Sequence, residues 1–586
     1  MKSLSQLAAL WGLALAGLLV VGPFELRQGI AVGPVTLTST ELVAALAAAV
    51  GCLCTLQALR LRVLVLAELW PLRWPVVALL TWSAVHLAST TWAEPPQGEV
   101  FKAGLRIAGQ MGLAVLTLIW AQQPQFVQRV KLGLLASLAV VTLLGSLERG
   151  LGRAFEPVLL QFRDEPTWML GEQRLSTVFY HANTCAAFLE LTAPVLLVAT
   201  VLASGWRRWV LGAWAATVAL LLSVTYSRAG FLAAAAGSLV LVAFGRSAAA
   251  RPLPQRKTLQ WLAGSWALIV VAAYALNPDM RARIGLDERS YRPVYEFDRG
   301  CAGHPGDAAR VVVRIRNRGA WALANRQAPA SLIHTWVTDR GKRVGDGWQF
   351  APMADLPPGQ TATVALDLQL PARPGDYVLA VDIFRDRVLR VSAVGAPMGW
   401  LGCTVVPPDE PVAMGAANTR PPANQDAVRE GRALDLERRH YWRAAVLLWA
   451  RKPWLGWGSD RFHSIHREYV PAQGFDPRAR AHSVVLETAV DLGVLGLGAL
   501  LALLVILALQ IRRTWCGNWQ ADAGLRIALL AGLAGFGVHS LVDFFLGYTQ
   551  IAVVVWPMVG VLLRPMAVLP DNGPPPDGSG PVASDA

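Results

Sequence analysis

The chain has 586 residues, of which 54% are hydrophobic and only 16% are charged. A soluble globular domain is about a quarter charged, so this composition excludes an ordinary soluble protein and indicates that lipid surrounds most of the chain. The formal charge of +13 raises the question of nucleic-acid binding. The basic residues, however, recur in every second connection between apolar runs, as the positive-inside rule of membrane proteins requires. We therefore expect no nucleic acid among the partners.

Apolar runs of about 17–25 residues recur along the chain, and each is long enough to cross a hydrocarbon core of ~30 Å. They predict a mainly α-helical polytopic membrane protein with about twelve transmembrane helices. The predicted spans start near Leu7, Leu42, Pro75, Ala103, Leu132, Ala186, Val210, Phe231, Leu259, Gly493, Ile527 and Ile551. The first run follows Lys2 as in a secretory signal. No clear small-residue cleavage site comes after it, so we expect a retained helix.

Basic residues mark one side of the membrane. They lie at Arg60, Arg62, Arg73, Arg129, Lys131, Arg207, Arg208, Arg246, Arg251, Arg256, Lys257, Arg512 and Arg513. By the positive-inside rule we expect these connections and both termini in the cytoplasm. The segment from about 277 to 485 then lies on the outer side, together with the connections around 148–183 and 226–230. The stretches polar enough to carry chemistry fall on that side.

A β-rich segment interrupts the helical pattern. Between Ala308 and about Thr404, stretches such as "ARVVVRIRNRG" and "TATVALDLQL" alternate apolar and polar residues, with turn sequences such as "LPPGQ" between them. Roughly seven short strands in about 100 residues are typical of an immunoglobulin-like β-sandwich. Cys301 and Cys403 bracket these strands on the expected oxidising side, where a disulfide persists. Two free buried thiols are the alternative.

These features predict an order of domains along the chain. Residues 1–276 form an N-terminal bundle of about nine helices, 277–300 an external connector, 301–406 the external sandwich, 407–430 a Pro-rich linker, 431–489 external amphipathic helices, 490–565 the C-terminal transmembrane helices, and 566–586 a disordered cytoplasmic tail. The amphipathic part, "LERRHYWRAAVLLWARKPWLGWG", combines arginines with tryptophans. That combination suits the lipid–water interface.

Four arginines are expected at the outer lipid–water boundary. Arg228 lies in a tight "SRAG" turn between two apolar runs, and an ionisable group at that depth is costly and indicates function. A snorkelling arginine is the alternative. Arg174, Arg439 and Arg443 are predicted on the same side, the last two one helical turn apart. Because planar guanidinium groups suit phosphate, this cluster predicts a site for a lipid-linked phosphate or diphosphate.

His482 opens an apolar helix in the stretch "RARAHSVVLE". It is the residue near these arginines that is suited to proton transfer at neutral pH, so we predict a general base, with a helix cap as the alternative. His181 and Asn183 open another helix at the same level and either contact substrate or cap that helix. Asp543 lies between the last two spans and either contacts substrate or pairs with an arginine. The histidines expected in a solvated loop are His463 and His466.

Five stretches, in chain order, resemble the region that defines the O-antigen ligase/polymerase superfamily of polytopic bacterial glycosyltransferases. They are "RLSTVFYHANTCAAFLEL", "TYSRAGFLA", "RRHYWRAAVLLWARKPWLGWGSDRF", "AHSVVLETAVDLGVLGLG" and "VHSLVDFFL". The resemblance covers roughly 174–565, apart from the inserted sandwich. It implies that the histidine of the "AH" element, here His482, activates the acceptor, and that arginines of the "SR" and "R-x-x-W" elements, here Arg228 and Arg439, hold the diphosphate. The family often has Asn after that histidine, whereas this chain has Ser483.

The resemblance also implies an inverting glycosyltransferase without metal or cofactor, in the bacterial inner membrane, with its site and its sandwich facing the periplasm. The donor is a glycan on undecaprenyl diphosphate. The acceptor is lipid A–core for a ligase, a growing glycan for a polymerase, or a protein for an O-oligosaccharyltransferase, and membrane lipids are the other expected partners. A polysaccharide or lipid transporter is the alternative from another class. Such a protein places polar residues near the bilayer midplane and pairs broken helices.

Overall fold

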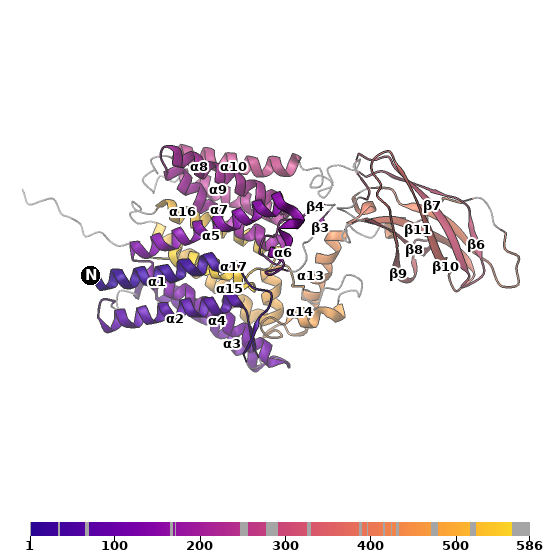
Figure 1. The fold of residues 1–586 in the computed structure, drawn as a ribbon. Helices are drawn as coiled ribbons and strands as arrows, with labels where there is room; N and C mark the ends of the chain where they lie inside the picture. The colour runs from indigo at the N-terminus through magenta and orange to yellow at the C-terminus, as the bar shows by residue number, and fades with distance from the viewer. Residues whose placement is uncertain are drawn as a thin grey trace, which may run out of the picture.

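The computed structural model describes residues 2–32, 35–64, 70–163, 168–169, 172–246, 256–276, 291–320, 322–324, 330–385, 389–394, 396–413, 417–423, 425–428, 433–469, 479–515 and 523–564. The protein is mostly helical, with a bundle of helices at one end and a β-rich module at the other (Figure 1). The predicted tail at 566–586 and most of the connector predicted at 277–300 lie outside the described residues.

The helices of the bundle run back and forth along a common direction (Figure 1). Their bounds are α1 (Lys2–Val21), α2 (Ser39–Arg60), α3 (Arg73–Ala88), α4 (Gln97–Trp120), α5 (Pro124–Leu151), α7 (Ala182–Leu202), α8 (Trp206–Ser223), α9 (Arg228–Arg246), α10 (Arg256–Leu276), α15 (Val484–Trp515), α16 (Ala523–Ser540) and α17 (Thr549–Leu562). Helix α13 (Ala433–Arg451) lies beside the bundle, and shorter helices are α6 (Glu156–Leu159), α12 (Gln425–Val428) and α14 (Phe462–Ile465). Two-stranded hairpins pair β1 (Ile30–Val32) with β2 (Val35–Leu37) and β3 (Trp168–Met169) with β4 (Glu172–Gln173).

Seven of the described helices are long and apolar enough to cross a membrane, namely α1, α2, α4, α5, α7, α15 and α16. Helices α9, α10 and α17 contribute shorter apolar segments. Each start residue predicted for a span falls inside a helix of the bundle. These findings fit a membrane protein, whereas a total of about twelve spans and the orientation in the bilayer stay predictions.

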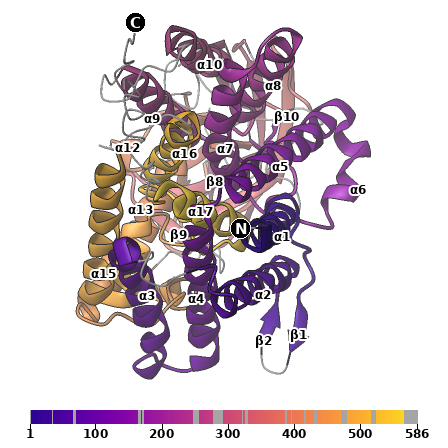
Figure 2. The same ribbon diagram turned by 90° about the vertical axis from the view of Figure 1, so that its left-hand side faces the viewer.

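Helix α7 lies at the centre of the bundle (Figure 2). Its apolar window is 89% buried, and it contacts α5, α8, α9, α16 and α17. Glycines let α16 approach its neighbours: a Cβ at Gly532 would overlap the carbonyl oxygen of Leu191, and one at Gly535 would lie 2.6 Å from the carbonyl oxygen of Ala233. In lipid, small residues allow helices to pack by such close approach of their backbones. Helices α7 and α16 are thereby fixed against each other.

Helix α15 is broken at Gly493, whose φ of 60° and ψ of −154° are not helical. The segment Pro453–Gly458 fills the break, and Val494 N donates to the carbonyl oxygen of Pro453 at 2.8 Å. Such bonds replace the intrahelical bonds that a break removes, so the freed backbone groups keep partners. The sequence predicted the start of a span near Gly493. The helix begins earlier, at Val484, and Gly493 marks its break.

Among the described residues, nine strands form the β-rich module. They are β5 (Pro293–Phe297), β6 (Cys301–Gly303), β7 (Ala308–Asn317), β8 (Ala330–Thr338), β9 (Arg343–Pro352), β10 (Thr361–Gln369), β11 (Gly375–Arg385), β12 (Leu389–Arg390) and β13 (Gly399–Val405). One sheet has the order β10-β7-β5, and the other has the order β6-β13-β11-β8-β9, with β12 beside β11. Within these sheets β13 and β6 are parallel, and the other pairs are antiparallel.

The apolar faces of the two sheets share one core. Strand β10 alternates exposed and buried residues along its length, and its Leu366 belongs to the same buried cluster as Leu379 of the other sheet. Cys301 and Cys403 are register partners in β6 and β13 and form a disulfide. The module begins at β5, which pairs with β7 ahead of the boundary predicted at Cys301. Its assignment to the immunoglobulin-like class stays a prediction.

Gly493→Ala should destabilise the protein by about 2 kcal/mol or more. Alanine is strained at this φ, and its Cβ would lie 2.5 Å from the carbonyl carbon of Trp454. Thermal unfolding in detergent micelles measures the effect. Gly498→Ala in the same helix is the matched control, because a Cβ there meets nothing within 4 Å. Equal unfolding temperatures for the two variants would contradict this account of the break.

Candidate functional site

His482 lies two residues before α15 begins. Its φ of 49° is in the left-handed region, which non-glycine residues rarely occupy and which is frequent at functional positions. The side chain is 30% exposed, and Nδ1 lies 3.2 Å from Oδ1 of Asp543, in the connection between α16 and α17. The Tyr441 ring of α13 packs against the histidine ring, with 5.7 Å between centroids.

A chain of side-chain hydrogen bonds continues from His482 to Arg174. Asn183 Nδ2 donates to Asp543 Oδ2 at 2.9 Å, and Arg174 Nη2 donates to Asn183 Oδ1 at 2.7 Å. Arg174 Nε also donates to the carbonyl oxygen of Thr225 at 2.8 Å. We call His482, Asp543, Asn183 and Arg174 the polar chain. It joins residues from α7, from the segment before it, and from the ends of α15 and α16.

The carboxylate of Asp543 orients the ring of His482. When Nδ1–H is directed at Oδ1, the neutral ring keeps its lone pair on Nε2. Asp543 is itself held, because it accepts the backbone N–H of Phe544 at 3.0 Å and its side chain is only 10% exposed. A base oriented by a third group in this way is the arrangement found in many acid–base and nucleophilic sites. Sequence reasoning had considered an arginine partner or a substrate contact for Asp543.

Arg228 is the first residue of α9 and is half-buried. Thr225, whose carbonyl oxygen holds Arg174, lies in the turn just before it. Gly230 packs against the first turn of α7, since a Cβ there would lie 3.0 Å from the Cβ of Ala186. The start of α9 therefore lies beside the start of α7, which carries the asparagine of the polar chain. A guanidinium group and the positive end of a helix dipole meet there, and both favour an anion.

Helix α13 presents Tyr441 and Arg443 on different sides. Tyr441 is buried against His482, whereas Arg443 is exposed. Residues two positions apart point about 200° apart around an α-helix. Tyr441 therefore faces His482, whereas Arg443 points away from it. The side chain of Arg439 lies outside the described residues, and its role stays a prediction.

The other histidines of the region have distinct surroundings. His181 occupies the N-cap position of α7 without a side-chain cap bond, and its exposed ring packs edge-on against Tyr180. The prediction of a solvated His466 is wrong: the residue is buried, its ring stacks on Phe462 with 5.0 Å between centroids, and its Nδ1 lies 3.0 Å from the Phe462 carbonyl oxygen. The reason is that the segment around His466 packs against α13, where Tyr441 contacts the His466 ring.

Tyr548, just before α17, and His463, in α14, have shifted pKa values. Burial raises the pKa of the Tyr548 hydroxyl well above its ordinary value, against the opposing effect of the nearby Arg480 charge. Burial also lowers the pKa of His463. Both groups are therefore uncharged at neutral pH.

Two carboxylates of α15 fix the backbone segments next to His482 by hydrogen bonds. They were not predicted from the sequence. Glu487 Oε2 accepts the backbone N–H of Ala481 at 2.7 Å, and Arg480 pairs with both Glu487 and Asp460. Asp491 accepts backbone N–H groups at the start of α14, the shortest at 2.7 Å from Asp460. The signal was available: "LETAVD" places two acids four residues apart, on one face of an otherwise apolar helix.

A buried ion pair supports the loop that carries Arg174. Glu148 Oε1 lies 3.0 Å from Arg163 Nη2, and the two side chains are 2% and 1% exposed. Glu148 Oε2 accepts the backbone N–H of Thr177 at 2.8 Å, and Arg163 Nη1 donates to the Ser176 hydroxyl at 2.7 Å. These bonds fix the loop just after Arg174 and hold Thr177 at a φ of 49°.

Comparison with known proteins identifies one segment. Residues 384–501 match the family model described as O-antigen ligase, which confirms the resemblance seen in the sequence. No curated protein matches the chain. Among solved structures, Pseudomonas fluorescens alkylpurine DNA glycosylase AlkC bound to DNA containing an abasic site analog is 11% identical and covers 56% of this chain and 97% of its own. Its TM-score is 0.14, too low to carry any argument.

Glu148→Ala should destabilise the protein by about 3–5 kcal/mol, because it leaves Arg163 buried without its partner. Thermal unfolding in detergent measures the loss. A double variant, Glu148→Leu with Arg163→Met, removes both charges and should recover a large part of it, since an apolar pair often replaces a buried ion pair without loss. Equal stability of Glu148→Ala and the wild type would contradict the supporting role of the pair.

Proposed function

Because residues 384–501 carry an O-antigen ligase segment, we propose that this chain is a membrane glycosyltransferase that moves a glycan from undecaprenyl diphosphate to an acceptor hydroxyl. The reaction takes place at the periplasmic face of the bacterial inner membrane, inverts the anomeric carbon and uses neither metal nor cofactor. In the leading form of the proposal the acceptor is lipid A–core. The observation that supports it most is the His482–Asp543 pair, which orients an imidazole near cationic residues at one end of the bundle.

The proton transfer is assigned to His482. Its Nε2 takes the proton of the acceptor hydroxyl while that oxygen attacks the anomeric carbon of the donor. The new carbon–oxygen bond forms opposite the diphosphate, and the bond between the anomeric carbon and the diphosphate oxygen breaks with its electron pair. A single displacement of this kind inverts the configuration. Asp543 stabilises the imidazolium, which afterwards releases its proton to water.

Stabilisation of the departing diphosphate is assigned to arginines. The negative charge that develops in the transition state is stabilised by cationic groups that are already in position. Arg228, at the positive end of α9, is the residue that the geometry favours for this contact. Arg439 is the second candidate from the resemblance. Arg174 donates hydrogen bonds to Asn183 and to the carbonyl oxygen of Thr225. We therefore assign Arg174 a positioning role: it orients Asn183, which in turn holds Asp543.

A polymerase and a protein O-oligosaccharyltransferase are the alternatives that use the same site. Surface glycans of a strain that lacks the protein separate the three. Loss of all capped lipid indicates a ligase, single-repeat caps without a ladder indicate a polymerase, and loss of protein glycosylation indicates the third enzyme. A transporter is less favoured, because Asn183, His482 and Asp543 of the polar chain lie at or just beyond helix ends and not in the middle of helices.

His482→Ala should reduce glycan transfer by about 100-fold or more, because general base catalysis contributes 10²–10⁴. Asp543→Asn should lower turnover by about 100-fold, since an amide donor favours the wrong tautomer of the histidine. Transfer from a polyprenyl-diphosphate donor in reconstituted vesicles measures both effects.

The controls for these variants are His304→Ala and Asp367→Asn, both in the β-rich module. They should transfer glycan at the wild-type rate, and all four variants should reach the membrane in equal amounts. Wild-type turnover in His482→Ala would refute the proposed base. Wild-type turnover in Asp543→Asn would refute only the orienting role of the carboxylate.

Arg228→Lys should lower turnover roughly 10- to 100-fold, because a charge-assisted hydrogen bond is lost and a point charge replaces a planar fork. The same vesicle assay measures the effect. Arg310→Lys, in the β-rich module, is the matched control, because that side chain is 68% exposed. An Arg228→Lys enzyme as active as this control would show that Arg228 does not hold the diphosphate.

A further inference from the structure

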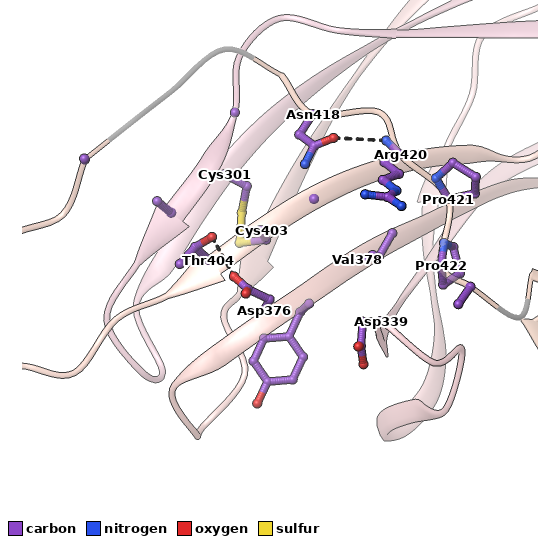
Figure 3. Close-up of a pocket in the computed structure, with 16 residues that line it drawn as sticks. Cys301, Asp339, Asp376, Val378, Cys403, Thr404, Asn418, Arg420, Pro421 and Pro422 are labelled. Atoms are coloured by element: carbon purple, nitrogen blue, oxygen red, sulfur yellow. Dashed lines mark hydrogen bonds between the residues drawn. A yellow bond between two sulfur atoms is a disulfide. The ribbon is translucent and has the colours of Figure 1, made fainter.

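A polar groove lies at the end of the β-rich module that points away from the helices. Its volume is about 850 Å³, within the range of sites for small ligands. One wall is the segment 417–423, and the floor is formed by the starts or ends of β8, β11, β13 and β6 (Figure 3). The polar residues Asp339, Asp376, Thr404, Asn418 and Arg420 are among those that line it.

The wall is fixed to the sheet by backbone hydrogen bonds. Gly402 N donates to the carbonyl oxygen of Asn418 at 2.7 Å, and Ala423 N donates to that of Asp339 at 2.8 Å. The side chain of Asn418 accepts the backbone N–H of Arg420 at 3.2 Å (Figure 3). The sequence predicted a linker over 407–430. Its 417–423 part instead packs on the sheet and gives the groove a defined shape.

The groove offers hydrogen-bond acceptors and donors together with flat apolar surfaces. The carboxylates of Asp339 and Asp376 accept, and the guanidinium of Arg420 donates. Pro421 and Pro422 add apolar rings from the wall at 417–423 (Figure 3).

This combination favours a sugar over other ligands. Sugar hydroxyls both donate and accept, and the C–H faces of the rings pack on apolar side chains. An acyl chain finds too much polar surface here. A phosphate-rich ligand meets two carboxylates and one guanidinium among the described lining residues, which is a net repulsion.

We propose that this groove is a second glycan-binding site, which holds an oligosaccharide far from the membrane. Strand β11 runs from the groove at Gly375 to the helix-facing end at Arg385, and its eleven residues span about 35 Å. If the proposed transfer is correct, on which this role rests, a glycan held at the groove and reacting near His482 contains several sugars. The groove therefore gives preference to long glycans over single repeats.

The test uses the full chain in lipid nanodiscs and two sets of probes. One set consists of oligosaccharides released by mild acid from the lipid-linked donor glycan of the producing cells, and the other is the saccharide part of the acceptor. The double variant Asp376→Ala with Arg420→Ala should bind one of the two sets at least tenfold more weakly than wild type in a thermophoresis titration. Which set is affected identifies the source of the glycan.

The matched control is Asp367→Ala with Arg310→Ala, an exposed pair on the other sheet whose loss should leave binding unchanged. Absence of binding by the wild type to both sets, or equal binding by wild type and groove variant, would overturn the inference. His482→Ala separates it from the proposed function. That variant should lose transfer and keep oligosaccharide binding, so each idea can fail without the other.

Discussion

A break inside a helix frees backbone groups that another segment has to satisfy where water does not reach them, and the organisation of the site depends on how this is done at Gly493. The segment Pro453–Gly458 is placed against the break. Gly458 N donates to the carbonyl oxygen of Asp491 at 2.8 Å, while the carboxylate of Asp491 accepts from the backbone at the start of α14. The backbone and the side chain of Asp491 thus connect α15 with the segment that follows α13 and with the start of α14. Because Tyr441 lies on α13 and His482 precedes α15, this arrangement also fixes their contact.

The polar chain makes a second set of connections, between parts of the chain that are remote in sequence. Asp543 is 360 residues from Asn183 and 61 from His482, and it contacts both. The close packing of α7 on α16 brings the first pair together, since Gly532 leaves room for the backbone of α7. The site is therefore composed from both halves of the bundle, although the family segment at 384–501 contains only one member of the polar chain.

The features that depend on local pattern were predictable from the sequence. Apolar runs of membrane length gave the position of the helices, and alternation along "TATVALDLQL" gave strand β10. The pairing of Cys301 with Cys403 followed from their places at the two ends of the module. The partner of Asp543 was not predictable, because nothing local indicates which of several cations or histidines a remote carboxylate meets. His466 was misplaced for a related reason, because its burial depends on how the segment after α13 packs against that helix.

In the part of the chain that the structure describes, both connections between the β-rich module and the helices lie at one end of the module. The incoming chain passes Tyr291, whose hydroxyl contacts Arg385, and the outgoing chain passes Val428, whose carbonyl oxygen accepts a bond from Arg390. Arg385 and Arg390 lie on the paired strands β11 and β12, where Arg385 is opposite Leu389 and Arg390 is opposite Phe384. The chain therefore enters and leaves the β-rich module at neighbouring points, as in a domain that is inserted into another domain. In evolutionary terms, a domain whose two ends lie close together can be gained, lost or exchanged by one insertion or deletion, and the order of the helices in the bundle does not change.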